Sequence, residues 1–367
     1  MPTSAGRRRP SPLYRAAVRL ARGVMPLAGA LSPKARHGHA MREGAAARLA
    51  AWAADSRDPA RPLLWLHAPS VGEGLQAEPV LRRLRARHPD WQYAWTFFSP
   101  SAERFAQRVG ADVADYLPYD SRSNVSGVLD ALRPDAVVFS KLDLWPELAA
   151  GAAARGVRVG LLAATVRPGS RRLRWPARDL LRPGYLAVAG AAAVAEEDAE
   201  RLSRLGVPRP RIVVVGDTRY DSVLERVAVV DPRDPLLGHA AGGPALVAGS
   251  TWPEDEAALL RAFTLVRAAQ PAARLILVPH EPTPEHLEGV DRAAARLGIP
   301  LPQRLSAAEG PAPFLLVDRT GVLAALYGAG ELAYVGGGFG RAGLHSVLEP
   351  AAWGRPVLVG PRWRESR

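Results

Sequence analysis

The segment Leu63-Leu-Trp-Leu-His-Ala-Pro-Ser-Val-Gly-Glu-Gly74 decides the fold class of this chain. Its first six residues form a short apolar run that is typical of a buried strand. The next residues are turn formers and helix starters, and a helical stretch follows at residues 75–87. A second apolar run begins at residue 93. Strand, loop, helix and strand in this order predict a crossover unit of a parallel sheet, with ligand-binding loops at the carboxyl ends of the strands.

The same alternation continues through most of the chain, in two series. The first has expected strands at 63–68, 93–96, 136–140 and 157–162, and expected helices at 75–87, 102–109, 125–132 and 146–154. The second has expected strands at 245–248, 274–278, 313–317, 332–335 and 356–359, and expected helices at 254–269, 284–297, 321–327 and 344–353.

The stretches Asp231-Pro-Arg-Asp-Pro235 and Gly238-His-Ala-Ala-Gly-Gly-Pro244 separate the two series and are rich in turn residues. We therefore expect an α/β chain with two Rossmann-like domains facing a cleft. The expected domains are residues 41–230 and 240–367, preceded by an N-terminal segment at residues 1–40.

Composition narrows the class of partner. The 367 residues are 48% hydrophobic and 23% charged, which suits a folded chain, and the absence of cysteine excludes disulfides, thiolate metal sites and cysteine nucleophiles. The net charge of +12 favours anionic partners, among them phosphorylated substrates and a negative membrane surface. We expect no nucleic-acid partner, because the sequence has neither a zinc pattern nor an RNA-binding aromatic motif.

The N-terminal segment has features of a membrane-surface helix. Basic residues 7–9 precede an apolar stretch at 13–31, which is interrupted by Arg15, Arg19 and Arg22 on one helical face. Only 11 residues separate Arg22 from Lys34, too few for a membrane span of about 20 residues. We expect a helix in the headgroup region with its arginines on anionic lipid. A helix packed on the domain and a cleaved signal peptide are the alternatives.

The loop after the first strand holds a candidate general base. Ser70 and Gly72 are suited to cap and tighten the turn, so Glu73 falls in the first helical turn. Glu73 can simply complement the helix dipole. It can also act as a general base if its pKa is raised and it reaches a substrate hydroxyl. His67 is expected to be a hydrogen-bonded core histidine, with a place in the cleft as the alternative.

A second loop, Lys141-Leu-Asp-Leu-Trp-Pro-Glu147, follows another apolar run. Pro146 suits the first position of a helix, and Asp143 is placed to cap that helix. Asp143 can instead face the cleft beside Lys141 as a second carboxylate. Trp145 is expected in the core.

The loops of the second series favour a phosphate or nucleotide site. Gly249-Ser-Thr251 precedes a helix whose free N–H groups can bind a phosphate, although a capped helix without a ligand is the alternative. His280 follows the next strand and can donate to a phosphate or carboxylate. Later glycines allow close approach of a ligand to the backbone. His345 and Ser346 would begin a helix on which Glu349 shares the face of His345 and can accept from ribose hydroxyls.

The residues that we expect to bind this ligand all lie in these loops. They are Gly249, Ser250, Thr251, His280, Gly336, Gly337, Gly338, His345, Ser346 and Glu349.

In their order along the chain, these loops resemble those of the 3-deoxy-D-manno-octulosonic acid (Kdo) transferases of lipopolysaccharide assembly. The resemblance runs from the N-terminal segment to the last residue. The matching stretches are Ser70-Val-Gly-Glu73, Leu117-Pro-Tyr-Asp120, Leu144-Trp-Pro146, Gly249-Ser-Thr251, Gly336-Gly337, His345, Leu348-Glu349-Pro350 and Gly360-Pro361. Each stretch is short, but the ordered combination is specific.

The resemblance implies a two-domain glycosyltransferase of the GT-B type. Its N-terminal domain would bind the acceptor and its C-terminal domain the CMP-sugar. The implied reaction is an inverting transfer of Kdo from CMP-Kdo to a lipid A precursor (lipid IVA), with Glu73 as catalytic base and without metal or cofactor. The implied location is the cytoplasmic face of the inner membrane, through a membrane-associating N-terminal segment. The alternatives are another nucleotide-sugar GT-B transferase, an epimerase, or an inactive truncated relative.

The sequence departs from the family pattern in several places. Glu-Thr-Glu is usual before Leu-Trp-Pro, and here Lys141 and Asp143 replace the two glutamates. The usual Pro-Arg-His is Pro279-His280, and the asparagine usual after His345 is Ser346. The family also normally continues beyond the position of Arg367, so the resemblance implies a shortened C-terminus.

Overall fold

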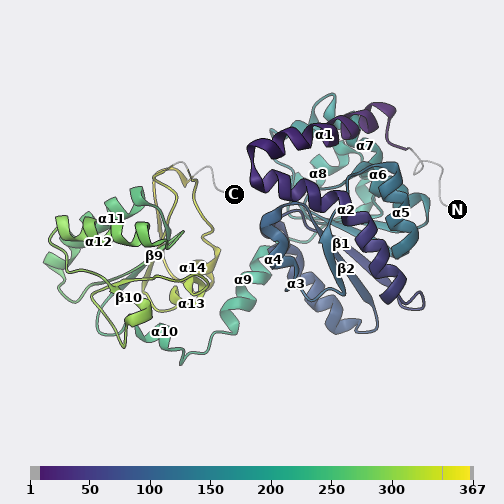
Figure 1. Cartoon of the computed structure of the whole chain (residues 1–367). Coiled ribbons are helices and arrows are strands. Elements are labelled where there is room, and N and C mark those ends of the chain that lie inside the picture. The colour runs from purple at the N-terminus through teal and green to yellow at the C-terminus, as the bar shows by residue number, and fades with distance from the viewer. Residues whose placement is uncertain (1–8, 341, 364–367) are drawn as a thin grey trace. The chain divides into compact units, whose positions relative to one another are not determined.

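The computed structural model describes residues 9–340 and 342–363 (Figure 1). Contacts between residues divide the chain into two compact units, Met1–Ser222 and Val223–Arg367. The predicted α/β class is confirmed, because each unit is built on a parallel sheet with helices against it.

The described part of the first unit holds a sheet of seven parallel strands in the order β3-β2-β1-β4-β5-β6-β7. The strand order reverses between β1 and β4, and α/β sheets bind ligands at the carboxyl ends of strands beside such a reversal. The strands are β1 (Leu63–His67), β2 (Gln92–Phe97), β3 (Val113–Tyr116), β4 (Ala136–Ser140), β5 (Arg158–Ala164), β6 (Gly190–Ala193) and β7 (Ile212–Val214).

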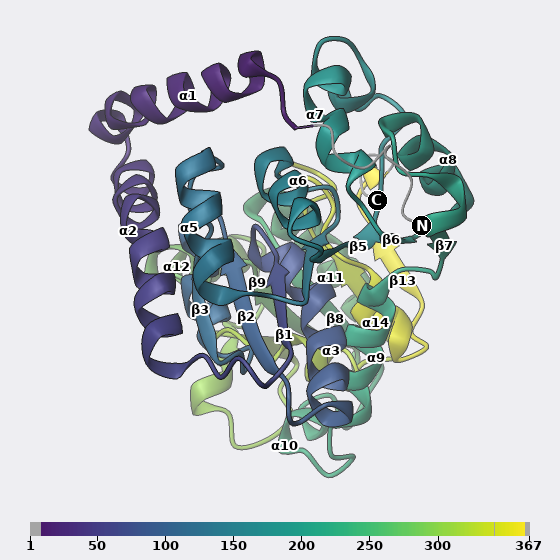
Figure 2. The same cartoon turned by 90° about the vertical axis from the view of Figure 1, so that its right-hand side faces the viewer.

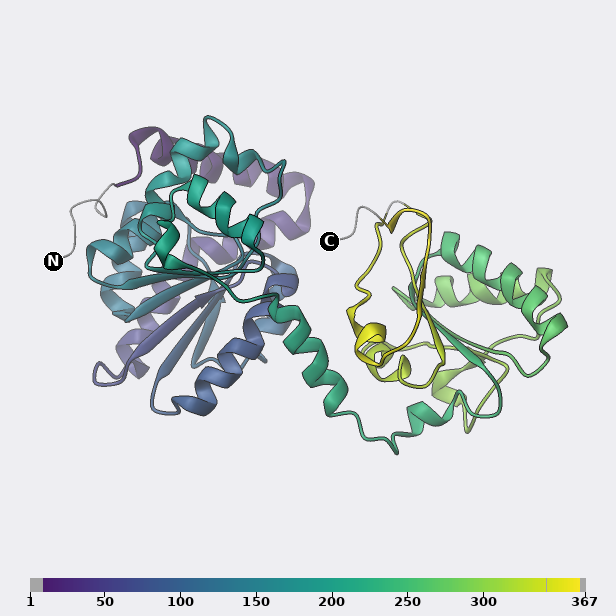
Figure 3. The ribbon, with the colours of Figure 1, turned by 180° about the vertical axis from the view of Figure 1, so that it is seen from behind.

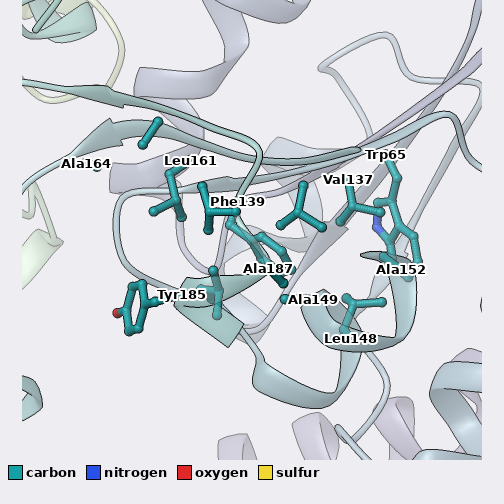
Figure 4. Packing of buried hydrophobic residues seen from close by; sticks show 14 of the residues in the cluster. Trp65, Val137, Phe139, Leu148, Ala149, Ala152, Leu161, Ala164, Tyr185 and Ala187 are labelled. Atoms are coloured by element: carbon teal, nitrogen blue, oxygen red, sulfur yellow. The ribbon is translucent and has the colours of Figure 1, made fainter. Parts of the chain in front are cut away.

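Helices cover both faces of this sheet. Because side chains alternate along a strand, Leu63 and Trp65 of β1 belong to one core, and Leu64 and Leu66 belong to the other. Figure 4 shows part of the first core, with Trp65, Phe139 and Tyr185 among its labelled residues. The first core is covered by α2 (Pro33–Ser56), α5 (Arg122–Leu132), α6 (Pro146–Ala154), α7 (Ala177–Leu186) and α8 (Glu196–Leu205), and the second by α3 (Val71–Arg87) and α4 (Glu103–Ala106).

The strands predicted for the first series are all present, but the prediction missed β3, β6 and β7 together with α7 and α8. The missed strands have only three or four residues each, and Gly-Ala-Ala-Ala of β6 has no β-branched residue to mark it. The helix predicted at 102–109 is shorter in the structure, since a 3₁₀ turn at Pro100–Ala102 leads into α4.

The second unit repeats the architecture. Within its described residues, six parallel strands lie in the order β10-β11-β9-β8-β12-β13, which reverses between β8 and β12. The strands are β8 (Ala245–Thr251), β9 (Arg274–Pro279), β10 (Gln303–Arg304), β11 (Phe314–Leu316), β12 (Leu332–Val335) and β13 (Val357–Val359). The helices are α11 (Pro253–Ala269) and α12 (Pro284–Arg296) on one face, with α10 (Pro235–Gly238) and α13 (Leu323–Leu326) on the other, and the short α14 (Leu348–Ala352).

The chain passes from the first unit to the second within α9 (Thr218–Ala228), a continuous helix (Figure 3). The sequence placed this join later, in the Pro- and Gly-rich residues 231–244. The start of α9 is tied to the first unit, because Asp217 accepts hydrogen bonds from Gln76 and from the backbone and side chain of Arg219. The boundary between the units therefore lies inside α9, before the turn-rich residues 231–244.

The N-terminal apolar segment forms α1 (Pro12–Leu31), which packs against α2 (Figure 2). The Tyr14 hydroxyl donates to Asp120 Oδ2 at 2.7 Å, and the Arg15 guanidinium bonds both carboxylate oxygens of Glu147 at 2.9 and 3.1 Å. Arg22 pairs with Glu43. In the structure, Arg15 and Arg22 are thus paired with carboxylates of their own unit, and the predicted contact of these arginines with lipid stays a prediction.

The opposite side of α1 is apolar and exposed. Leu13, Leu20, Val24 and Leu27 are between 48% and 70% exposed, and their spacing of seven, four and three residues places them along one stripe. None of the helices among the described residues has an apolar stretch long enough to cross a membrane. Residues 7 and 8 of the predicted basic run lie outside the described residues.

Asp120 links α1 to the rest of the first unit. Its buried carboxylate accepts from the Tyr14 hydroxyl and from the backbone N–H groups of Glu147 and Leu148, at 2.8 and 2.9 Å, in the first turn of α6. Burial raises the pKa of Asp120 to about 6, although the three donors oppose that shift.

We expect Tyr14→Phe to lower the free energy of unfolding by about 1–3 kcal/mol at pH 8, because it leaves a buried carboxylate without one donor. The hydroxyl stabilises the charged carboxylate, so its loss raises the pKa of Asp120 further. The deficit should therefore be full above the raised pKa of Asp120 in the variant, and it should shrink as pH falls through that value toward 6, where the wild-type carboxylate also protonates. Urea unfolding at pH 5 and pH 8 measures the difference. Tyr220→Phe, at an exposed tyrosine, is the matched control, and an equal loss at both pH values would contradict the expectation.

Candidate functional site

Glu73 lies in the first turn of α3, directly beyond β1, as the sequence predicts. Its Oε2 accepts from the Ser70 hydroxyl, and its Oε1 accepts from Lys141 Nζ at 2.9 Å. The Ser140 hydroxyl also donates to the Glu73 carbonyl oxygen at 3.2 Å. Because Lys141 follows β4, this contact joins the two loops at the reversal of strand order.

The electrostatic environment of Glu73 differs from that expected of a general base. Burial alone would raise the pKa of Glu73, but hydrogen bonds from Ser70 and Lys141 and the charge of Lys141 lower it below its ordinary value. In the structure Glu73 is therefore ionised at neutral pH but is a weakened base. The condition of a raised pKa is not met in this state.

The candidate second carboxylate, Asp143, has another partner. His67 Nε2 bonds Asp143 Oδ2 at 2.9 Å, and Trp145 Nε1 donates to the same oxygen at 3.1 Å. His67 Nδ1 in turn lies 3.0 Å from Thr96 Oγ1. His67 is fully buried, so the expected hydrogen-bonded core histidine is confirmed.

The ionisation of Asp143 decides where the proton lies in its contact with His67. Burial would raise the pKa of Asp143, yet the hydrogen bond and charge of His67 lower it, with help from Trp145 and Arg172. An ionised carboxylate only accepts, so the proton of the contact lies on His67 Nε2. Asp143 therefore does not cap α6, whose N-terminus is bonded by Asp120, but holds the loop after β4 against the end of β1.

In the second unit, Asp255 connects the loops at the reversal of strand order. The fully buried Asp255 accepts from the Tyr334 hydroxyl at 2.6 Å, the Trp252 N–H at 3.0 Å and the Gly337 N–H at 2.8 Å. The next residue, Glu256, accepts from the Thr251 hydroxyl at 2.8 Å and contacts His286 Nε2 at 2.9 Å. The sequence analysis missed both carboxylates. Asp255 bonds the N-cap N–H as the third residue of a capping box does, but Trp252 is not a capping residue, so the sequence has no capping-box signature here.

Three rings gather beside these carboxylates. Trp252 Nε1 donates to His345 Nε2 at 3.0 Å, and the two rings are inclined by only 10°. His280 stacks over both, with ring centroids 4.9 Å from Trp252 and 4.4 Å from His345. The structure thus brings the predicted residues His280 and His345 together. Trp252, which the sequence analysis did not select, contacts both rings.

The pKa of His345 is lowered by its burial and by the neighbouring His280, and the charge of Asp255 only partly offsets this. His345 is therefore neutral at physiological pH. Since its Nε2 accepts from Trp252, its proton lies on Nδ1, which makes Nδ1 a hydrogen-bond donor.

The glycines of the second unit are required by backbone packing. A Cβ at Gly336 would lie 2.2 Å from the Ser250 carbonyl oxygen, and one at Gly337 would lie 2.0 Å from the Gly343 carbonyl oxygen. A Cβ at Gly338 would lie 2.8 Å from the backbone of Gly360. These positions exclude side chains whether or not a ligand approaches.

Several predicted placements are wrong. Gly249, Ser250 and Thr251 end β8 instead of forming a helix N-terminus, and Thr251 is fully buried. Gly249 lies against Tyr327, whose hydroxyl would be 2.2 Å from an added Cβ.

The helix expected to begin at His345 and Ser346 begins at Leu348. Gly343 has a positive φ and residues 343–347 form no regular structure, so His345 lies outside the helix and Glu349 does not share a helical face with it. Glu349 pairs with Arg226 at 2.8 Å, and Ser346 is exposed.

Within residues 9–340 and 342–363, no group of three or more ligating side chains is arranged to hold a metal ion. The absence of a metal and of a cofactor from the reaction stays a prediction.

The fold defines a class of protein with two Rossmann-like α/β units. The UDP-GlcNAc 2-epimerase from Neisseria meningitidis bound to UDP-GlcNAc is similar in fold, with a TM-score of 0.55 and 16% identity over 81% of this chain and 82% of that one. A likeness at this identity shows the fold alone.

Sequence comparison identifies a family domain in the chain. Residues 43–222, which include Glu73, Lys141 and Asp143, match the family model described as 3-Deoxy-D-manno-octulosonic-acid transferase (kdotransferase). This part of the chain thus has the Kdo transferase domain, and the chain as a whole is similar to curated Kdo transferases over about 80% of its length.

Two relatives illustrate the match. The 3-deoxy-D-manno-octulosonic acid transferase of Bordetella pertussis is 29% identical over 81% of this chain and 71% of its own length. The enzyme of the same name from Aquifex aeolicus is 27% identical over 81% of this chain and 76% of its own length.

We expect His280→Ala to raise the pKa of His345, because the substitution removes a neighbouring positive charge and exposes the imidazole to water. A titration of the histidine ring signals by NMR measures the shift. His88→Ala, at a histidine of the first unit, is the control and should leave His345 unchanged. An unchanged or lowered pKa of His345 in His280→Ala would contradict the electrostatic account.

Proposed function

We propose that this chain is an inverting glycosyltransferase that moves Kdo from CMP-Kdo to a lipid A precursor. The observation that carries the proposal is Glu73, which sits at the strand-order reversal inside the segment matched to the family. The names of the curated relatives support the same donor sugar.

In the proposed reaction, Glu73 takes the proton of an acceptor hydroxyl. The hydroxyl oxygen forms a bond to the anomeric carbon of Kdo while the bond from that carbon to the phosphate oxygen of CMP breaks. The proton stays on Glu73 and the electron pair leaves with CMP, so charge and atoms balance. Attack opposite the departing group inverts the anomeric centre. The contact of Asp143 with His67 would hold the loop that carries Lys141 in place.

The second unit would bind the donor through the predicted residues of its loops. His280 and a neutral His345 with its proton on Nδ1 would donate hydrogen bonds to phosphate or carboxylate oxygens. Stabilising the charge that develops on the leaving phosphate lowers the barrier to transfer. Gly249, Ser250, Thr251 and Gly336–Gly338 would shape this site through the backbone, while Ser346 and Glu349 stay as proposed ligand contacts.

We further propose that the protein works on the cytoplasmic face of the inner membrane, held at an anionic lipid surface by α1. The support is the exposed stripe of Leu13, Leu20, Val24 and Leu27, whose helix is fixed to the unit through its other side. The apolar stripe, and not the arginines paired within the protein, would enter the bilayer surface.

Glu73→Gln should reduce Kdo transfer by about 10²–10⁴-fold, because the amide cannot accept the proton. The measurement is mass spectrometry of a lipid A precursor after incubation with CMP-Kdo. Binding of CMP, measured by calorimetry, should be unchanged. Glu285→Gln is the matched control, since Glu285 is an exposed glutamate in the first turn of α12.

Full turnover by Glu73→Gln would remove Glu73 as the base. Tighter binding of UDP than of CMP would favour another nucleotide-sugar enzyme, and CMP binding without any product would favour an inactive relative.

Replacing Leu20 and Leu27 by serine should weaken binding to phosphatidylethanolamine–phosphatidylglycerol vesicles at least about tenfold, because each leucine buried in lipid contributes about 1.5–3 kcal/mol. Flotation measures the bound fraction. The matched control replaces Leu265 and Leu301, which are 75% and 67% exposed on the second unit. Equal flotation of the two double variants would contradict the proposed role of α1.

A further inference from the structure

We propose that Lys141 binds an anionic group of the sugar substrate with the ammonium donors that Glu73 leaves free, and that this contact releases Glu73 to act as base. The inference rests on the proposed function and adds an anion-binding, positioning residue to it. It concerns a lysine at a position where the family pattern has glutamate, so it is a property of this chain's own sequence.

The first step of the argument is the donor count. An ammonium group has three N–H donors. Lys141 uses one of them on Glu73 Oε1, at 2.9 Å, and among the described residues its other two have no acceptor. The Lys141 side chain is 36% exposed, so these two donors are open to a ligand from solvent.

The second step is the backbone that places this side chain. Lys141 has φ of 55°, in the left-handed region that residues other than glycine rarely adopt. Its own N–H donates to the Leu162 carbonyl oxygen at 2.7 Å, which fixes this turn to β5. A strained conformation held at the end of β4 directs the ammonium group to Glu73, and such strain is concentrated at functional positions.

The third step is the charge balance around the pair. Glu73 is bonded by Ser70 and Lys141, whereas the ionised Asp143 has its own partners in His67 and Trp145. Lys141 is therefore the positive group that acts on Glu73. An anion bound to Lys141 would oppose its charge and raise the pKa of Glu73 toward the value that a base requires.

Phosphate and carboxylate share this chemistry, so both are tested. The chain has only two lysines, Lys34 and Lys141. Protein labelled with ¹³C-lysine therefore gives two ε-methylene signals, and the exposed Lys34 is an internal control. Inorganic phosphate and, separately, lactate are titrated into the full chain at constant ionic strength.

We expect the Lys141 signal to shift and saturate with at least one anion while the Lys34 signal stays in place. The pH dependence of the Lys141 signal reports the protonation of Glu73. The pKa of Glu73 obtained in this way should rise by about one unit when the anion is bound. In Glu73→Gln that pH dependence should vanish while anion binding persists. A Lys141 signal that follows Lys34 with both anions would overturn the proposal. Because this readout needs no turnover, its failure is distinct from failure of the proposed function.

The kinetic counterpart is the acid limb of the pH–rate profile. In the wild type the limb for kcat should lie at higher pH than the limb for kcat/KM, since the former reports the complex and the latter the free enzyme. In Lys141→Met the two limbs should coincide at the higher pH, with KM raised at least about tenfold. Lys141→Arg should restore KM, and Lys34→Met should behave as wild type. Separated limbs in Lys141→Met would overturn the proposal.

Discussion

The ion pair between Glu73 and Lys141 spans the point at which the strand order of the first sheet reverses. One partner follows β1 and the other follows β4, so the pair also fixes the two loops to each other. Its consequence is chemical as well as structural, because the same ammonium group that holds the carboxylate lowers its pKa. The carboxylate that we propose as the catalytic base is thus kept ionised but weakly basic, and the proposed reaction through it requires a change in the surroundings of Lys141.

Two other carboxylates of the first unit, Asp143 and Asp120, show that the hydrogen-bond partners of a carboxylate decide its role. Asp143 is bound by His67 and Trp145 and orients a loop, whereas Asp120 receives backbone N–H groups and caps α6. Burial dominates at Asp120 and raises its pKa to about 6, while at Asp143 hydrogen bonds and charge outweigh burial. Residue type and position after a strand do not distinguish these cases. The donors that surround each carboxylate do.

The alternation of apolar runs and helical stretches was sufficient to predict two parallel sheets and their central strands, among them β1 and β4, but it missed the short strands β3, β6, β7 and β10. The same reasoning placed Glu73 in the first turn of α3. It failed where tertiary contacts override local pattern. The contact of Lys141 with Glu73 depends on a positive φ that sequence does not reveal, and Asp255 binds Gly337 across 82 residues of chain. The sequence also predicts a helix from His345, whereas the structure has a loop there that follows glycines with positive φ.

A glycine-rich loop can reflect close backbone packing or close approach of a ligand, and the second unit allows these two causes to be told apart. Its glycines at 336–338 are each required by a neighbouring backbone, so the folded chain alone accounts for them and they carry no information about a ligand. His280 is different, because it is an exposed ring stacked on a hydrogen-bonded pair of rings and no packing requirement demands a polar residue there. The case for a binding site in this unit therefore depends on the chemistry of its rings and hydrogen-bond donors, and a glycine motif should count only where its glycines have no such neighbours.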